Sequence, residues 1–122
     1  MKKKTVEMPY PGSVISVNHY LGRNKAGDTY VKAEASAWMR MLGWQIKTSH
    51  IEDWKLPVTV IVSGTFRDTR SCPDIHNLLK CTCDAIEEVT GINDRNYKTE
   101  TKEPVIDNTT DPVLKITIKE SE

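Results

Sequence analysis

The sequence has no long apolar run and only three cysteines among its 122 residues. No hydrophobic stretch approaches the ~20 residues that a helix needs to cross a membrane, so the composition argues against a membrane-spanning protein. The lysines after Met1 are not followed by the apolar segment of a secretory signal, because Thr5 to Pro9 alternates and then breaks. An odd number of cysteines fits a reducing compartment better than a disulfide framework. We therefore expect a cytoplasmic protein.

The sequence also lacks a net charge, with 17 basic and 17 acidic residues. A balanced total argues at first against a nucleic-acid partner, but the distribution is uneven. Residues 1–80 carry 12 lysines and arginines against 7 acidic residues, whereas residues 81–122 carry 5 against 10. A basic surface and an acidic patch can coexist on one molecule, and a metal-dependent nuclease needs both. The alternative is that the two halves interleave in space and the asymmetry has no function.

What is present is the composition of a soluble globular protein, 38% hydrophobic and 28% charged, and the length fits one domain over residues 1–122. Trp38 and Trp44 are typical of a core or a dimer contact rather than of a base-stacking platform.

The β-loop-α-β-α-β-β order of expected elements predicts an α+β fold, with two main helices against a small mixed or antiparallel sheet. Hydrophobic periodicity predicts these elements: a strand over 3–8, a loop over 13–29, a helix over 31–46, a strand over 56–66, a helix over 73–90, and strands over 97–102 and 113–119.

Four cations are candidates for binding DNA. Arg23 and Lys25 lie in the long predicted loop, where Tyr20 adds a ring suited to bases. A mobile surface loop is the alternative. Arg67 and Arg70 precede the second helix, where a phosphodiester would need a counter-charge.

The second predicted helix has an unusual polar face. Asn77, Lys80 and Asp84 gather within a narrow arc at 100° per residue, and Asp94 follows just after Gly91. The opposite, core-facing side has the spacing of an amphipathic helix and consists of Ile75, Leu78, Leu79, Thr82, Ile86 and Val89.

These residue types are the parts of a hydrolytic metal site. Carboxylates such as Asp74, Asp84 and Asp94 hold Mg²⁺ or Mn²⁺, and a lysine such as Lys80 can position a phosphate. If the helix begins only at residue 77, His76 would join Asp74 at the site. The alternative is a solvated face, with Asp74 as a helix cap and Lys80 and Asp84 as an ordinary i,i+4 pair.

A zinc site built from Cys72, His76, Cys81 and Cys83 is the competing interpretation. Cys81 and Cys83 would lie about 200° apart on a helix, so they cannot converge on one tetrahedral ion. We expect the cysteines to pack as small apolar residues.

The second helix resembles the signature of the RusA family of Holliday-junction resolvases. That signature reads D-x-D-N-x-x-K-x-x-x-D-A-L, followed after a short gap by D-D-x-Q. The matching positions here are Asp74, Asn77, Lys80, Asp84 and Asp94. A first strand that ends in Pro-Tyr-Pro and a loop that contains an asparagine also resemble the family.

The resemblance implies a small homodimer that binds four-way DNA junctions and cuts them symmetrically with Mg²⁺ or Mn²⁺. Such proteins are bacterial and are often encoded by phages or prophages. Carried over by position, Asp74 and Asp94 would be metal-binding carboxylates and Lys80 the essential lysine. Asn77 and Asp84 would support the site.

Two positions depart from the signature. His76 stands where the second aspartate belongs, and Asn93 replaces the first residue of the D-D pair. Losing a carboxylate should weaken Mg²⁺ binding, whereas an imidazole at residue 76 suits Mn²⁺ better. We expect a Mn²⁺-preferring or weakened endonuclease. The alternatives are a junction-binding protein that has lost cleavage, and an unrelated α+β interaction domain without salt-dependent DNA affinity.

Overall fold

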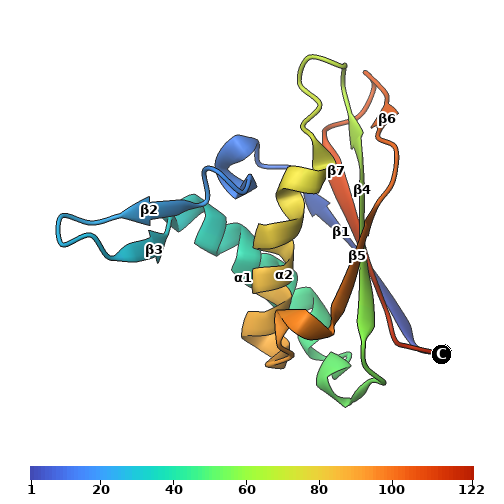
Figure 1. Cartoon of the computed structure of the whole chain (residues 1–122). Helices are drawn as coiled ribbons and strands as arrows, with labels where there is room; N and C mark the ends of the chain where they lie inside the picture. Colours follow the sequence, from blue (N-terminus) through green and yellow to red (C-terminus); the bar gives the residue numbers. More distant parts are fainter.

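The computed structural model, which describes all 122 residues, is built on a mixed β-sheet. Its strand order is β1-β7-β4-β5, and the short β6 also pairs with β4. β7 pairs antiparallel with β1 and β4, whereas β5 and β6 run parallel to β4 (Figure 1). The strand bounds are Lys3–Pro9 (β1), Val58–Phe66 (β4), Tyr97–Thr101 (β5), Val105–Ile106 (β6) and Val113–Lys119 (β7). The predicted α+β class and mixed sheet are confirmed.

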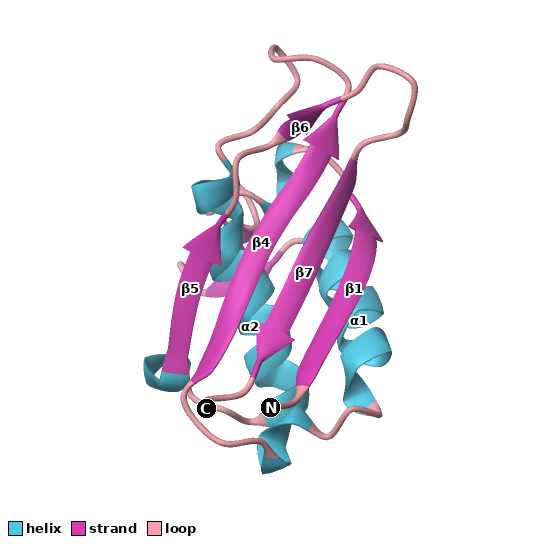
Figure 2. Ribbon diagram, turned by 90° about the vertical axis from the view of Figure 1, so that its right-hand side faces the viewer, coloured by secondary structure: helices cyan, strands magenta, loops and turns pink.

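Two helices, α1 (Ala33–Lys47) and α2 (Leu79–Thr90), cover one face of this sheet and leave the other face open (Figure 2). Because side chains alternate along a strand, each strand gives every second residue to the helices. In β7 these are Leu114, Ile116 and Ile118, all fully buried. One core of 25 buried residues results between the helices and the sheet.

The predicted second helix begins later than expected. Residues Ile75–Leu78 form a 3₁₀ turn (η3), and α2 starts only at Leu79. Asp74 has an extended backbone, and its carboxylate accepts a hydrogen bond from the His76 N–H at 3.1 Å. An acid that caps a helical start in this way stabilises the exposed N–H groups there. The helix ends as predicted at Gly91, whose φ of +74° is the left-handed conformation that glycine adopts readily.

The predicted loop over residues 13–29 is only partly a loop. Leu21–Arg23 (β2) and Thr29–Val31 (β3) pair as a separate antiparallel hairpin that projects away from the sheet (Figure 1). In the turn between β2 and β3, the Asn24 side chain accepts hydrogen bonds from the Ala26 and Asp28 N–H groups, each at 3.0 Å. The prediction missed the hairpin because each strand has only three residues, too short for a visible alternation.

Three further 3₁₀ turns occur, at Ser13–Ile15 (η1), Ile51–Asp53 (η2) and Asp94–Asn96 (η4).

The two tryptophans of α1 have different surroundings. Trp38 is buried and its indole N–H donates to the Pro9 carbonyl at 3.0 Å, whereas Trp44 is 74% exposed. The structure contains no helix with the length and apolar character of a membrane span.

Candidate active site

The polar face of α2 borders a groove of about 460 Å³, which we call the α2–β5 groove. It brings together four parts of the chain: the segment between η1 and β2, the η3–α2 segment, the η4 turn after α2, and the neighbouring strand β5. Five of the predicted site residues lie along it, namely His76, Asn77, Lys80, Asp84 and Asp94. Val17, Leu79, Cys83, Tyr97 and Thr99 complete the lining.

Lys80 and Asp84 form the expected i,i+4 pair, with the Lys80 ammonium 3.1 Å from Asp84 Oδ1. A third group, which the sequence prediction did not place here, completes the contact. The Tyr20 hydroxyl donates to Asp84 Oδ2 at 2.6 Å. Both carboxylate oxygens of Asp84 therefore accept hydrogen bonds from the chain itself.

The suggestion that Tyr20 stacks on a DNA base is wrong, because only 1% of this residue is exposed. Burial, followed by the hydrogen bond to Asp84, raises the pKa of the phenol. The phenol therefore keeps its proton at neutral pH and acts as a donor to Asp84.

The Lys80 ammonium is the central cation of the groove. The hydrogen bond to Asp84 and the charge of that carboxylate raise the lysine pKa, and the nearby Asp94 and Glu87 add to the effect. About half of the side chain is exposed to solvent. Lys80 is thus fully charged at neutral pH and accessible to an anion in the groove.

Asp94 is held at the groove by the η4 turn. Its N–H donates to the Glu87 carboxylate at 3.0 Å, and the Asn93 side chain accepts the Arg95 N–H at 3.1 Å. Asn93, the residue that departs from the D-D pair, therefore caps this turn, as an aspartate would. The departure at residue 93 therefore keeps a side-chain oxygen that caps the turn next to Asp94.

Asp74 lies beside this groove. It lines a smaller hollow of about 220 Å³ with the β5–β6 connection, including Lys102 and Glu103. His76 lines both the hollow and the α2–β5 groove, and so stands between Asp74 and the other site residues.

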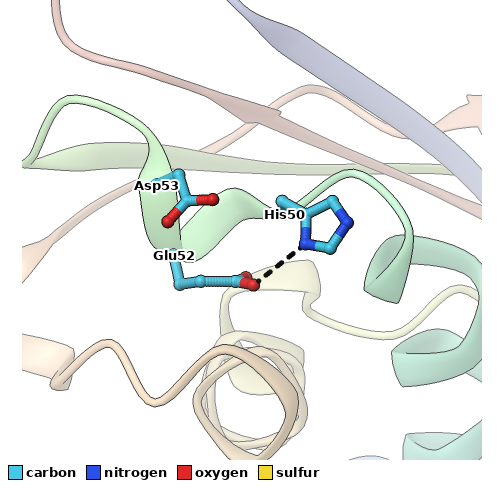
Figure 3. Close-up of side chains that lie close together, drawn as sticks. All are labelled: His50, Glu52 and Asp53. Carbon is cyan, nitrogen blue, oxygen red and sulfur yellow. Dashed lines mark hydrogen bonds and ion pairs between the residues drawn. The ribbon is translucent and has the colours of Figure 1, made fainter.

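Only one group of three potential metal-binding side chains has all its ligand atoms within 4.8 Å of one another, and it lies elsewhere. It consists of His50, Glu52 and Asp53 at η2 (Figure 3). All three are exposed, and the His50 ring lies 3.3 Å from the Glu52 carboxylate. Exposed acidic groups of this kind are common without an ion. The predicted ligands around the groove do not form such a closed group.

The predicted DNA-binding cations are all exposed but differ in their partners. Arg23 lies on β2 and Lys25 in the hairpin turn. Arg67 Nη2 pairs with the Asp111 carboxylate at 2.8 Å, whereas Arg70 lies in the connection between β4 and η3. Arg67 is thus the one whose charge is partly balanced within the chain.

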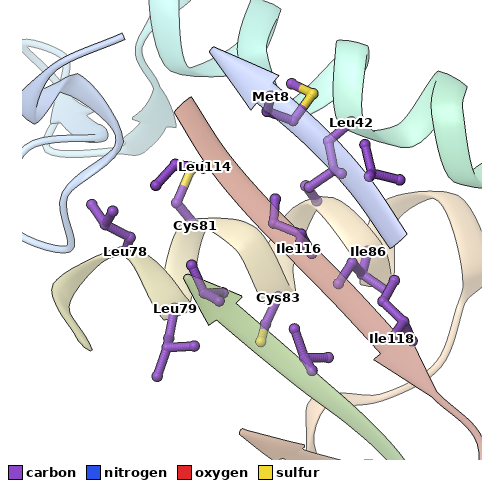
Figure 4. Close-up of a cluster of buried hydrophobic side chains, with 14 of the residues drawn as sticks. Met8, Leu42, Leu78, Leu79, Cys81, Cys83, Ile86, Leu114, Ile116 and Ile118 are labelled. Atoms are coloured by element: carbon purple, nitrogen blue, oxygen red, sulfur yellow. The ribbon is translucent and has the colours of Figure 1, made fainter. Parts of the chain in front are cut away.

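Cys81 and Cys83 on α2 are both buried in the hydrophobic core and pack as small apolar residues, as predicted (Figure 4). Burial raises the pKa of Cys81 to about 12 and that of Cys83 to about 11. Cys72 is half-buried, and all three thiols are free.

Comparison with known proteins identifies a family for this chain. A family model described as Endodeoxyribonuclease RusA matches residues 11–119, which include every residue of the α2–β5 groove. The comparison with curated proteins found no match.

Proposed function

Because the chain belongs to the endodeoxyribonuclease RusA family, whose members resolve Holliday junctions, we propose that it cuts four-way DNA junctions in a reaction that needs a divalent metal. The proposed active form is a homodimer that makes two symmetric nicks, with residues 1–122 of each copy as one catalytic domain. Two-fold symmetry in the protein matches paired cuts in a junction whose arms are related in pairs.

One observation carries this proposal. Lys80 lies in the first turn of α2 and Asp94 lies in the η4 turn that follows this helix. Both border the same groove as His76. An ordinary solvated helix face would lie open to water, whereas here residues of the η4 turn and of β5 line a groove together with α2. The groove therefore supports a reaction site rather than an ordinary polar surface.

Asp74, His76 and Asp94 are the proposed metal ligands. Two carboxylates and one imidazole are chemically suited to a divalent cation, and the nitrogen favours Mn²⁺ over Mg²⁺. When bound, such an ion supplies positive charge to the phosphate and makes a bound water more acidic. The ligand atoms of the three side chains do not lie within 4.8 Å of one another in this structure, so holding one ion would require these side chains to move closer together.

The chain's own residues bind and orient the phosphodiester. The Lys80 ammonium pairs with a phosphate oxygen and balances the negative charge that develops as the bond breaks. Asp84, engaged on both oxygens, orients this lysine rather than the metal. The Asn77 side chain, exposed at the end of η3, offers an amide to the same substrate.

A second candidate function is junction binding without cleavage. The observation that favours it is His76, which removes one carboxylate from the signature. Both candidates require DNA affinity that falls as salt concentration rises.

The deciding experiment uses an end-labelled four-way junction with Mg²⁺, with Mn²⁺ and with EDTA. We expect paired nicks that need metal, and more of them with Mn²⁺. A shifted band without nicks would support the binding protein instead. Absence of any salt-dependent binding would defeat both candidates.

A further inference from the structure

We propose that Tyr20 is a positioning residue of the reaction, because its hydroxyl holds the Asp84 carboxylate, which in turn holds the Lys80 ammonium at the groove. This inference rests on the proposed function, in which Lys80 binds the phosphate. Tyr20 itself does not touch the substrate.

The Lys80–Asp84 pair alone would not hold the lysine in place. Exposed i,i+4 ion pairs are weak, and both side chains keep much of their rotational freedom. The Tyr20 hydroxyl removes that freedom from Asp84. Its contact with Oδ2 at 2.6 Å is a short hydrogen bond to a charged acceptor, and such bonds are among the stronger ones in proteins. Because Tyr20 holds Oδ2, the Asp84 carboxylate presents Oδ1 to the Lys80 ammonium in one orientation.

Tyr20 is itself firmly placed. Only 1% of Tyr20 is exposed, and the residue belongs to the hydrophobic core. Its N–H donates to the Ser16 carbonyl at 3.1 Å, and its carbonyl accepts the Lys32 N–H at 2.9 Å. The hydroxyl thus extends from a fixed ring to a carboxylate 64 residues further along the chain.

The same tyrosine connects the hairpin to the groove. Tyr20 directly precedes β2, and Lys32, to which its carbonyl is bonded, directly follows β3. A second tie lies nearby, because the Val17 N–H donates to the Asn77 carbonyl at 2.8 Å. The position of Lys80 is therefore set relative to the hairpin that carries Arg23 and Lys25.

The test is Tyr20→Phe, which removes the hydroxyl and keeps the ring. We expect kcat for junction cleavage to fall about tenfold while Kd for the junction changes less than twofold. Tyr10→Phe is the matched control, because Tyr10 is partly buried against Phe66 and lies outside the groove. It should cleave as the wild type does.

A second readout needs neither metal nor DNA. In the NMR spectrum of the free protein, the two ε protons of Lys80 should have distinct shifts because the side chain is held. They should merge in Tyr20→Phe and in Asp84→Asn as the side chain begins to rotate. The Tyr20/Asp84 double variant should cleave no more slowly than Asp84→Asn alone, since both changes break one linkage.

The positioning role is overturned if Tyr20→Phe keeps the wild-type kcat and the distinct Lys80 signals, or if the two changes add. A wild-type protein that does not cut junctions would defeat the proposed function instead. The NMR comparison would then still decide whether Tyr20 holds Lys80.

Discussion

At the scale of single residues, His76 is the proposed determinant of the metal preference, and it borders both the α2–β5 groove and the hollow of Asp74. We predict that His76→Asp raises junction cleavage in Mg²⁺ about tenfold and reduces the advantage of Mn²⁺. The added carboxylate restores a hard oxygen donor and negative charge at the site. Cleavage rates across a titration of each metal measure the change.

The matched control is His19→Asp. It makes the same change of side chain at an exposed turn outside the groove and should leave the metal preference unaltered. If His76→Asp gives no gain in Mg²⁺, residue 76 is not a metal ligand.

Replacing Lys80 should lower the cleavage rate far more than the stability of the fold. We predict that Lys80→Gln lowers single-turnover cleavage by about 10²-fold, which is typical of losing one donor to a developing charge. Stability should fall by no more than about 0.5 kcal/mol, because an exposed i,i+4 pair contributes little. Urea denaturation beside the cleavage assay distinguishes the two effects. A large loss of stability with unchanged cleavage would give Lys80 a structural role.

At the scale of elements, the hairpin is the proposed arm that binds DNA. Replacing Arg23 and Lys25 together by alanine should weaken junction binding. The slope of log K against log salt concentration should shrink by about 2, since two phosphate contacts are lost. Equilibrium binding at four or more salt concentrations measures this slope. Replacing Lys3 and Lys115, which are exposed on the open face of the sheet, should leave it unchanged.

The elements that could be predicted are those whose own residues repeat with the right period. The last strand was predicted at its observed bounds, because Leu114, Ile116 and Ile118 alternate with polar residues. The start of α2 was placed too early, because Asp74 stabilises a 3₁₀ turn that has nearly the same periodicity as an α-helix. The two-residue strand β6 and the hairpin gave no pattern to detect.

The same distinction holds for the site. Lys80 and Asp84 could be paired from sequence because one helical turn separates them. Tyr20 could not, because no local pattern reports a contact across 64 residues. Thr99 and Tyr97 were missed for a related reason: β5 reaches the groove only through its parallel pairing with β4.

At the scale of the whole molecule, the exposed face of α1 is the proposed dimer contact. Trp44 is 74% exposed and Met41 is 49% exposed, and the two lie three residues apart on one face of α1, where neighbouring exposed apolar side chains indicate an interaction site. We predict that Trp44→Glu yields a monomer in light scattering and converts paired cuts into single nicks. Asn108→Glu, which adds the same charge at an exposed turn, should stay dimeric. A dimer that survives Trp44→Glu would place the contact elsewhere.

The buried thiols report on global unfolding. At pH 8 we expect Cys72 to be the one thiol that reacts with a maleimide, and to react more slowly than a free cysteine because burial raises its pKa. Cys81 and Cys83 should react only after denaturation, because burial keeps them protonated, with pKa values of about 12 and 11, and excludes the reagent. Mass spectrometry of labelled protein with and without urea counts the modified thiols. Rapid labelling of all three without urea would show that α2 detaches from the sheet.

The position of β7 constrains the time at which this protein becomes active. β7 is the last strand to be synthesised, yet it lies between β1 and β4 and pairs with both (Figure 2). Until residues 113–119 leave the ribosome, β1 has no partner in the sheet and the helices lack the strand that buries Leu114, Ile116 and Ile118. A nascent chain therefore cannot hold the groove in its final shape. Translation itself delays the appearance of a DNA-cutting activity until residues 113–119 have been made.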